Sequence, residues 1–437
     1  MLAVLALAAP VSARAELVAP GIVSGALAVA PDGSPRVAYV QGADLVLATR
    51  TESGWTAERA ATLPGAGGSI AGVAVSTSGR VAVLAEAGNG RWLVLYERTA
   101  ATARLTSLLP RLARGARAGR AGLALDRRGL PVVAYAEWRR SQRTYLRLVQ
   151  FERGRYRARP VTRRGFPPSN VAPAAAPVVL RSGVIRVVEA YGGSGSAAID
   201  WMPQRADWLG QFLYSSPLAA LVGGVWAAAA LGGGVDAAWT VEFPRLGTLG
   251  VVLAHHGTPV QTAVALDDAV LAGLTVGANG PLLAATDVVD AGSGILTAAV
   301  LRDPAGATVE LDGAAAGIAA APDGATQVLL ARGGSLEWYA VPAGPVPRVT
   351  LAAAPAPGGV ALSGRVDGAT GGSVTLYRER PGAERVAIAS APLSSDGSFS
   401  ALDDPAGGGP AFYRAVFTEP ATGLPSASLL RSAVASG

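Results

Sequence analysis

The stretch LALDRRGLPVVAY, from Leu123 to Tyr135, contains the pattern that decides the fold of this chain. An apolar run is followed by a short polar turn that ends in Gly129, and a second apolar run follows the turn. Glycine adopts positive φ angles without steric cost, and an acidic or amide residue shortly before it is typical of hairpins. The stretch therefore predicts two antiparallel strands joined by a tight turn.

Seven copies of this unit, with drift, run through most of the chain. The first is LAVAPDGSPRVAY, and the turn glycines of the copies are Gly33, Gly79, Gly129, Gly183, Gly233, Gly280 and Gly324. Neighbouring turn glycines are therefore 46, 50, 54, 50, 47 and 44 residues apart. Repeats of roughly 40–50 residues that contain short strands are typical of β-propeller blades.

Two further strand-like runs follow each unit. In the first copy they cover residues 44–50 and 55–63, and in the third copy 144–152 and 156–161. Four strands per unit correspond to one propeller blade. The sequence therefore predicts an all-β chain whose main part is a seven-bladed β-propeller. Six or eight blades remain possible if one unit is misread, and a β-sandwich with irregular hairpins is the alternative fold.

The unit LALDRRGLPVVAY, followed by YLRLVQFERGRY at residues 145–156, resembles the blades of secreted bacterial β-propeller repeat proteins. Those blades carry ALDxxGxPxVAY followed by W/F-x-G-x-W/Y. The resemblance covers residues 17–344 and is clearest in the first and third copies. It implies a propeller fold and an exported protein. It implies no single activity, because function depends on sites that differ between proteins of one fold.

The repeat period changes after Arg348. Seven short strand-like runs in the last 90 residues predict a small β-sandwich: 349–353, 360–366, 373–380, 385–389, 398–402, 411–417 and 428–434. The segments SVTLYRERPG, LSSDGSFS and AFYRAVF are similar to bacterial immunoglobulin-like or fibronectin-type-III-like modules. We therefore expect a signal peptide at 1–15, a β-propeller at 16–344 and an immunoglobulin-like β-sandwich at 345–437.

The first residues read MLAVLALAAPVSARAE. A short apolar run followed by Ala13-Arg14-Ala15 is the pattern of a secretory signal peptide with its cleavage site, although the usual basic start is missing. The alternative is an N-terminal β-strand. The signal peptide predicts a secreted or cell-surface protein. The uncharged residues 209–235 contain Pro217 and six glycines and lie in repeat register, so we expect no membrane span in the mature chain.

The seventh unit shows only three strands before a Pro-rich linker. Residues 16–22 precede the first unit and have no partner within it. We expect them to supply the outermost strand of the last blade, because this closes the ring and protects a free sheet edge.

Composition and charge restrict the chemistry. The chain has no cysteine, which excludes disulfides, thiolate metal sites and cysteine nucleophiles. Between Arg104 and Arg164 there are 17 arginines and three acids, a balance of +14 in a chain whose net charge is +6. Such a basic region favours anionic partners such as phosphate- or uronate-bearing polymers. The alternative is a solvated, Arg-rich surface. We expect an anionic cell-surface glycan or protein as partner, and no nucleic acid.

Propeller ligands usually bind around the central channel, on the face built by the loops between blades. Many arginines of the basic region fall in such loops around the third blade, and Trp138 beside them could stack on a sugar or a guanidinium. The predicted ligand-binding residues are Arg111, Arg114, Arg117, Arg120, Trp138, Arg139, Arg140, Arg143, Arg163 and Arg164. No catalytic residue, metal ligand or cofactor is predicted.

Acids that could serve a hydrolase are present but do not stand out. A glycosidase needs paired carboxylates, and the candidates are Glu189, Asp200, Asp236 and Asp287. The only histidines, His255 and His256, are expected in a surface turn with their side chains on opposite sides. The leading hypothesis is an exported, non-catalytic binding or scaffolding protein. The alternatives are a polysaccharide hydrolase or lyase acting at the channel, and a structural subunit of an extracellular assembly.

Overall fold

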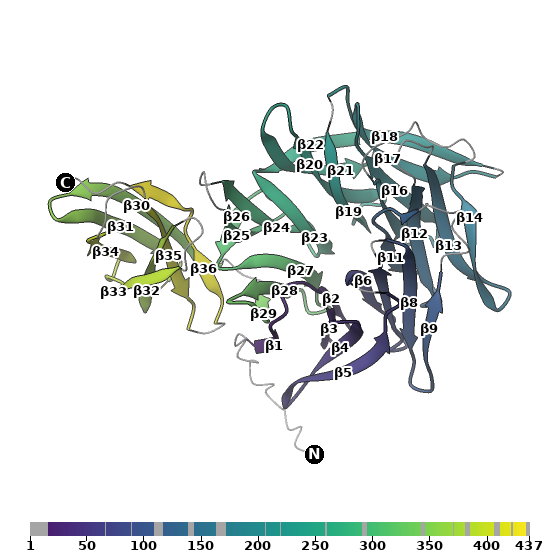
Figure 1. The fold of residues 1–437 in the computed structure, drawn as a ribbon, viewed down its shortest axis with the longest axis horizontal. Helices are drawn as coiled ribbons and strands as arrows, with labels where there is room; N and C mark the ends of the chain where they lie inside the picture. Colours follow the sequence, from purple (N-terminus) through teal and green to yellow (C-terminus); the bar gives the residue numbers. More distant parts are fainter. Residues whose placement is uncertain are drawn as a thin grey trace, which may run out of the picture.

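The computed structural model describes residues 16–433, except for 66, 89, 109–116, 139–143, 163–171, 206, 219, 258–259, 291–294, 342–345, 370, 381–384, 406–410 and 421–422. The regular secondary structure of these residues consists of β-strands (Figure 1). The prediction of an all-β chain is confirmed. No described segment forms a helix long and apolar enough to cross a bilayer.

Seven successive groups of four antiparallel strands, called blades below, follow one another in the described residues. Blade one is β2 (Ala26–Val29), β3 (Pro35–Gln41), β4 (Asp44–Thr51) and β5 (Gly54–Thr62). Blade two is β6 (Gly68–Val75), β7 (Val81–Ala87), β8 (Trp92–Arg98) and β9 (Ala103–Ser107). Blade three is β11 (Gly122–Leu125), β12 (Pro131–Trp138), β13 (Tyr145–Glu152) and β14 (Arg155–Pro160), with the short β10 (Arg117–Ala118) also paired to β12.

The remaining blades continue the same order. Blade four is β15 (Ala174–Val179), β16 (Ile185–Tyr191), β17 (Ser196–Pro203) and β18 (Trp208–Ser216). Blade five is β19 (Leu221–Ala229), β20 (Val235–Phe243), β21 (Thr248–His256) and β22 (Val260–Asp267). Blade six is β23 (Ala269–Gly277), β24 (Gly280–Asp290), β25 (Ile295–Arg302) and β26 (Thr308–Leu311). Blade seven is β27 (Ala314–Ala320), β28 (Thr326–Arg332), β29 (Ser335–Val341) and β1 (Glu16–Pro20).

The first strands of the blades form the inner wall of a closed ring. Each inner strand contacts the inner strand of the next blade, and β27 returns to contact β2. Figure 1 shows the blades arranged around this common centre. The uncharged residues 209–235 form parts of β18, β19 and β20, as the repeat register predicts. The sheets and the ring therefore confirm the β-propeller prediction.

The hairpin inside each blade follows the chemistry of its turn. At Gly129 the φ angle is +72°, and the Gly129 N–H donates to the carbonyl of Asp126 at 2.9 Å. The Asp126 carboxylate accepts the N–H groups of Arg128 and Leu130, each at 2.8 Å. Asp126 is thereby a turn residue, as the repeat predicts.

Glycines on the inner strands let neighbouring blades approach closely. A β-carbon at Gly72 would lie 3.2 Å from Cβ of Leu123 in the next blade, and one at Gly273 would lie 2.9 Å from Cγ2 of Ile318. The same contact occurs between Gly317 and Leu27, where a β-carbon would lie 3.3 Å from the leucine backbone nitrogen. All three glycines lie at a register shift of their strand. The bulge and the missing side chain together make room for the neighbouring blade.

The N-terminal strand closes the ring. β1 pairs antiparallel with β29 and is the outermost strand of blade seven. Its Glu16 carboxylate lies 2.6 Å from Nη2 of Arg50 in blade one, and this guanidinium stacks 4.8 Å from the ring centre of Trp338 in blade seven. The prediction that residues 16–22 supply this strand is confirmed.

The C-terminal segment forms two sheets that share one apolar core. One sheet consists of β30 (Arg348–Ala356), β31 (Gly359–Asp367) and β34 (Ser398–Asp403). The other contains β32 (Ser373–Glu379), β33 (Val386–Pro392), β35 (Ala411–Thr418), β36 (Pro425–Ala427) and β37 (Arg431–Ala433). All seven predicted runs overlap a strand, whereas β36 was not predicted. The immunoglobulin-like assignment of 345–437 stays a prediction.

β36 also joins the C-terminal segment to the propeller. It pairs with the outer strand β26, so blade six and the second C-terminal sheet are continuous. Leu424 is fully buried against blades six and seven. The buried Asp312 carboxylate binds Nε of Arg332 from blade seven at 2.9 Å and Nη2 of Arg385 at 2.8 Å. These contacts fix the C-terminal sheets to the ring.

The inner-strand contacts predict a specific sensitivity to substitution. We expect Gly273→Ala to lower the free energy of unfolding by about 1–3 kcal/mol, because its β-carbon must displace the Ile318 side chain. Gly232→Ala is the matched control, since the same β-carbon meets open space there and should change stability by less than about 0.5 kcal/mol. Denaturant unfolding measures both variants, and equal effects would contradict the crowding at the inner wall.

Candidate functional site

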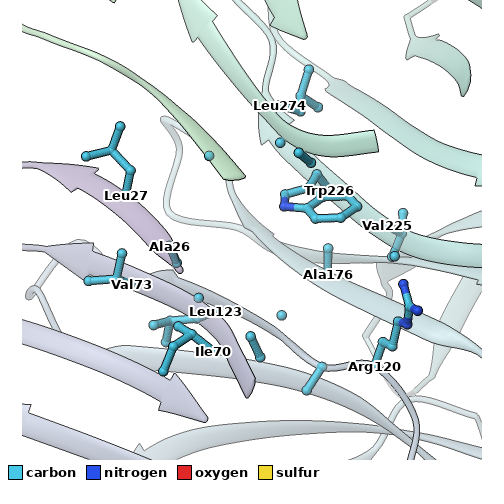
Figure 2. Close-up of a pocket in the computed structure, with 18 of the residues that line it drawn as sticks. Ala26, Leu27, Ile70, Val73, Arg120, Leu123, Ala176, Val225, Trp226 and Leu274 are labelled. Atoms are coloured by element: carbon cyan, nitrogen blue, oxygen red, sulfur yellow. The ribbon is translucent and has the colours of Figure 1, made fainter. Parts of the chain in front are cut away.

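The ring encloses a central cavity of about 490 Å³. All seven inner strands or the residues just before them contribute to its wall, mostly through Gly, Ala, Val, Leu and Ile. Figure 2 shows Leu27, Ile70, Val73 and Leu123 around this space, together with the aromatic ring of Trp226. Glu86 and Arg120 are the charged residues among the described lining.

Arg120 is held at the mouth of the cavity by backbone contacts between blades three and four. Its carbonyl accepts the N–H of Ala175 at 2.9 Å, and the two inner strands form a parallel bridge here. A β-carbon at Gly122 would lie 2.7 Å from the Ala175 carbonyl oxygen, and one at Gly119 would collide with the carbonyl of Pro173. The glycines on both sides of Arg120 therefore permit the close approach that fixes its position.

Glu86 lies beside Arg120 at the end of β7. Its Oε1 accepts the N–H of Ala121 at 2.8 Å. Burial raises the pKa of Glu86, and the Ala121 hydrogen bond and the charge of Arg120 oppose this shift. The mouth thus carries one exposed cation beside one partly shielded carboxyl group.

Trp226 projects into the cavity from blade five (Figure 2). A β-carbon at Gly224 would lie 2.6 Å from the six-membered ring of Trp226, so only glycine leaves room for the indole. A register shift between Val222 and Val225 lies directly before it. The other side of Trp226 packs against the apolar residues between blades five and six. The bulge therefore places a large aromatic ring in the wall of the channel.

Three of the predicted ligand-binding residues lie together on the rim beside this mouth. Arg117 is directly opposite Trp138 in the β10–β12 pair, and Arg120 follows Arg117 by three residues. The Ala118 N–H donates to the carbonyl of Gly90 in blade two at 2.9 Å, so the rim is tied to two blades. Both arginines are exposed and Trp138 is half-buried. The other predicted residues lie outside the described ones: Arg111, Arg114, Arg139, Arg140, Arg143, Arg163 and Arg164.

Sequence reasoning missed Glu86 and Trp226. Glu86 occupies the end of a second strand without any distinguishing motif, and its role follows from the Ala121 N–H of the next blade. A sequence signal did exist for Trp226, because two adjacent glycines inside an apolar strand indicate a bulge or a close approach. The sequence placed this tryptophan among the residues between blades, which is true of only one of its sides.

The prediction for the two histidines is wrong in part. Both lie in β21 and not in a surface turn, because that strand continues to residue 256. His256 is buried, and its Nδ1 lies 2.5 Å from Oδ2 of Asp200 in blade four. His255 points to the other side, where its Nδ1 lies 2.7 Å from Oδ1 of Asp236. The prediction that they face opposite sides is confirmed.

The candidate carboxylates for hydrolysis do not converge on the channel. Glu189 faces the apolar residues between blades three and four, whereas Asp200 is paired with Arg186 and with His256 of blade five. Glu86 is the single carboxylate among the described lining residues. A glycosidase of the usual kind needs two. Among the described residues no group of three or more potential ligands could hold a metal ion.

Among the candidate carboxylates named above, Glu189 has the most strongly shifted pKa. It is fully buried, Nε1 of Trp201 donates to its Oε2 at 3.2 Å, and its Oε1 has no hydrogen-bond partner among the described residues. Burial raises its pKa from 4.5 to about 8, against the Trp201 hydrogen bond. The carboxyl group therefore keeps its proton at neutral pH.

Because native Glu189 keeps its proton, the free energy of unfolding is expected to depend on pH. The native state retains it between about pH 4.5 and pH 8, where the unfolded chain has lost it. Glu189 therefore makes stability fall as pH rises through this window, by on the order of 5 kcal/mol in total. We expect Glu189→Gln to remove this fall, measured as unfolding free energy against pH. The exposed Glu52→Gln is the control, and a pH profile of Glu189→Gln that matches the parent protein would contradict the buried, protonated state.

Comparisons with known proteins concern the fold. No family model matches the chain, and no curated protein sequence matches it. Among solved structures it is similar to a mutant of puromycin hydrolase in a complex, with a TM-score of 0.50 and 15% identity over 82% of this chain and 61% of that one. The puromycin hydrolase structure without the mutation has a TM-score of 0.48 and 14% identity over 80% of this chain and 62% of the other.

The chain thus spans about three-fifths of the length of the puromycin hydrolase chains that it matches. It is also similar to the BP39L lectin from Burkholderia pseudomallei, with a TM-score of 0.47 and 15% identity over 74% of this chain and 96% of the lectin. At these identities the similarities bear on the fold alone. The sheet topology shows a β-propeller, and the match with a TM-score of 0.50 is consistent with that fold.

Proposed function

We propose that this chain is an exported, non-catalytic binding protein that holds an anionic glycan or protein at the channel rim of blades two and three. The observation that carries the proposal is the pair Arg117 and Arg120. Both are exposed, and backbone bonds to neighbouring blades hold the main chain at Ala118, beside Arg117, and at Arg120. Export is proposed from residues 1–15 alone, which lie outside the described residues.

The rim is suited to carboxylate or phosphate groups. A guanidinium can donate two parallel hydrogen bonds to either group, and such charge-assisted bonds are stronger than neutral ones. Because the backbone beside both arginines is already fixed, only their side chains have to be ordered on binding. Trp138, opposite Arg117, adds an aromatic surface beside the cations. The rim therefore combines charge recognition with a surface on which a sugar can pack.

The wider charge distribution supports the same partner. The stretch from residue 104 to 164 has a balance of +14, so the remaining chain has a balance of −8. A charge asymmetry of this size attracts anionic polymers to one region of the surface and speeds their association at low ionic strength. Glu86 as the single carboxylate in the described lining favours binding over the hydrolase alternative.

The rim arginines provide the test. We expect Arg117→Ala and Arg120→Ala each to weaken binding of polygalacturonate by roughly 10- to 100-fold at low salt, since each removes a charge-assisted contact. Isothermal titration measures the affinities, with neutral dextran as the comparison ligand. Raising the salt concentration should weaken binding by the parent protein more than binding by the variants.

Arg128→Ala is the matched control, because it removes the same charge from the Asp126 turn at the other end of the blade-three hairpin. It should leave the affinity within about twofold of the parent, as expected for a charge away from the site. If all three variants lose affinity equally, binding depends on net charge and not on the rim. If none loses affinity, the rim is not the site.

A further inference from the structure

The channel wall offers more than apolar side chains. In the described residues, β2, β6, β15, β19, β23 and β27 each lie at the end of their sheet, so that one edge pairs with the next strand of the same blade. On the other edge, single bonds reach the neighbouring blade, such as those from the N–H groups of Ala175 and Leu271. These strands line the cavity, so their other edge borders it. Backbone N–H and C=O groups that are removed from bulk water require partners. Inner-strand backbone groups that lack such a bond can therefore be partners for a hydroxylated ligand, and most wall residues beside them are small.

Trp226 supplies the one aromatic surface of the described lining. Figure 2 shows its ring in the cavity, between Leu274 and Val225. A flat indole that is fixed from behind by apolar packing is suited to the C–H face of a sugar ring, because both surfaces are apolar and rigid. The backbone groups of the wall can then meet the hydroxyls at the rim of the same sugar.

The charges lie at one end of the cavity. Arg120 and Glu86 are beside the mouth, and the rest of the described lining carries no charged side chain. A carboxylate therefore finds its partner at the mouth, whereas a charge farther inside would be desolvated without compensation. A purely apolar ligand would leave the backbone groups of the wall unsatisfied. The wall thus selects a hydroxylated ring that carries a single carboxylate.

The volume matches a small ligand. A cavity of about 490 Å³ lies within the range of roughly 300–1,000 Å³ that is usual for small-molecule sites. A long polymer can lie across the rim, but the cavity can admit only a short part of it. The terminal residue of a polymer is short enough to enter the cavity.

From these observations we propose that the channel is a second subsite, which takes the terminal uronic acid residue of the anionic glycan bound at the rim. The terminal ring stacks on Trp226, its carboxylate binds Arg120, and its hydroxyls bond to the inner-strand backbone. The proposal rests on the proposed function for the polymer; the two share Arg120, whereas Trp226 and the inner-strand backbone belong to the channel alone. The rim then holds the glycan along its length, and the channel holds its end.

Short ligands separate the two subsites. We expect galacturonic acid and its trimer to bind the parent protein in isothermal titration, and glucose to bind at least about tenfold more weakly because it lacks the carboxylate. Trp226→Ala should weaken the trimer by about tenfold or more, while polygalacturonate keeps a salt-sensitive affinity through the rim. Arg117→Ala should do the reverse, with a large effect on the polymer and a small one on the monomer.

A second variant protects the test against loss of packing. Ala26 lines the cavity opposite the region of Trp226 in the ring, and Ala26→Leu narrows the space without removing any core side chain (Figure 2). It should weaken the trimer as Trp226→Ala does, while the melting temperature stays close to that of the parent.

Three results would overturn the channel subsite. The first is that polygalacturonate binds but the trimer shows no measurable binding. In that case the proposed binding at the rim still holds. The second is trimer binding that neither Trp226→Ala nor Ala26→Leu changes. The third is binding of a short peptide with a free C-terminal carboxylate, sensitive to both variants, without any binding of the sugar acids. If polygalacturonate also fails to bind, the proposed function itself fails, and this outcome is distinct from the first two.

Discussion

The structure depends on how closely the inner strands approach one another. Leu123, Ile318 and Leu27 each pack onto a glycine of the neighbouring inner strand, where a β-carbon would come within about 3 Å. These contacts bring the blades together at the centre, and the pairing of β1 with β29 then completes the ring. The same crowding leaves a cavity whose wall is largely backbone and small side chains. The constraint that closes the fold therefore also produces the channel.

The candidate site lies where the regular arrangement of inner strands is interrupted. In blade three the first strand divides into β10 and β11, and Arg120 lies between them with its carbonyl bonded to blade four. Glu86, which accepts the Ala121 N–H, comes from blade two, and the aromatic ring of Trp226 comes from blade five. On the far side, β36 makes blade six continuous with the C-terminal sheets, and Asp312 binds arginines from both parts. The C-terminal sheets thus attach to blade six and not to the rim of blades two and three.

Local patterns in the sequence predicted most of the fold. The turn glycines, the four strands of each unit and the closing strand at 16–20 follow from alternation and turn chemistry, which act within a few residues. Arg117 and Trp138 were predicted as ligand-binding residues from the local concentration of arginines, and that role stays a prediction. The pairing of His256 with Asp200, the hydrogen bond to Glu86 and the addition of β36 to blade six were not found. Each of these depends on contacts between different blades or sheets, which no local pattern encodes.

The central claim is that ligand contacts converge on the channel and on its rim at blade three. Hydrogen–deuterium exchange with and without the galacturonic acid trimer tests it most directly, because exchange reports protection of individual backbone segments. The account predicts that the trimer slows exchange at residues 117–123 and 224–227, with little change in the C-terminal strands β30–β37. Protection confined to the C-terminal sheets or to the outer strands of the blades, with the inner strands unchanged, would contradict it.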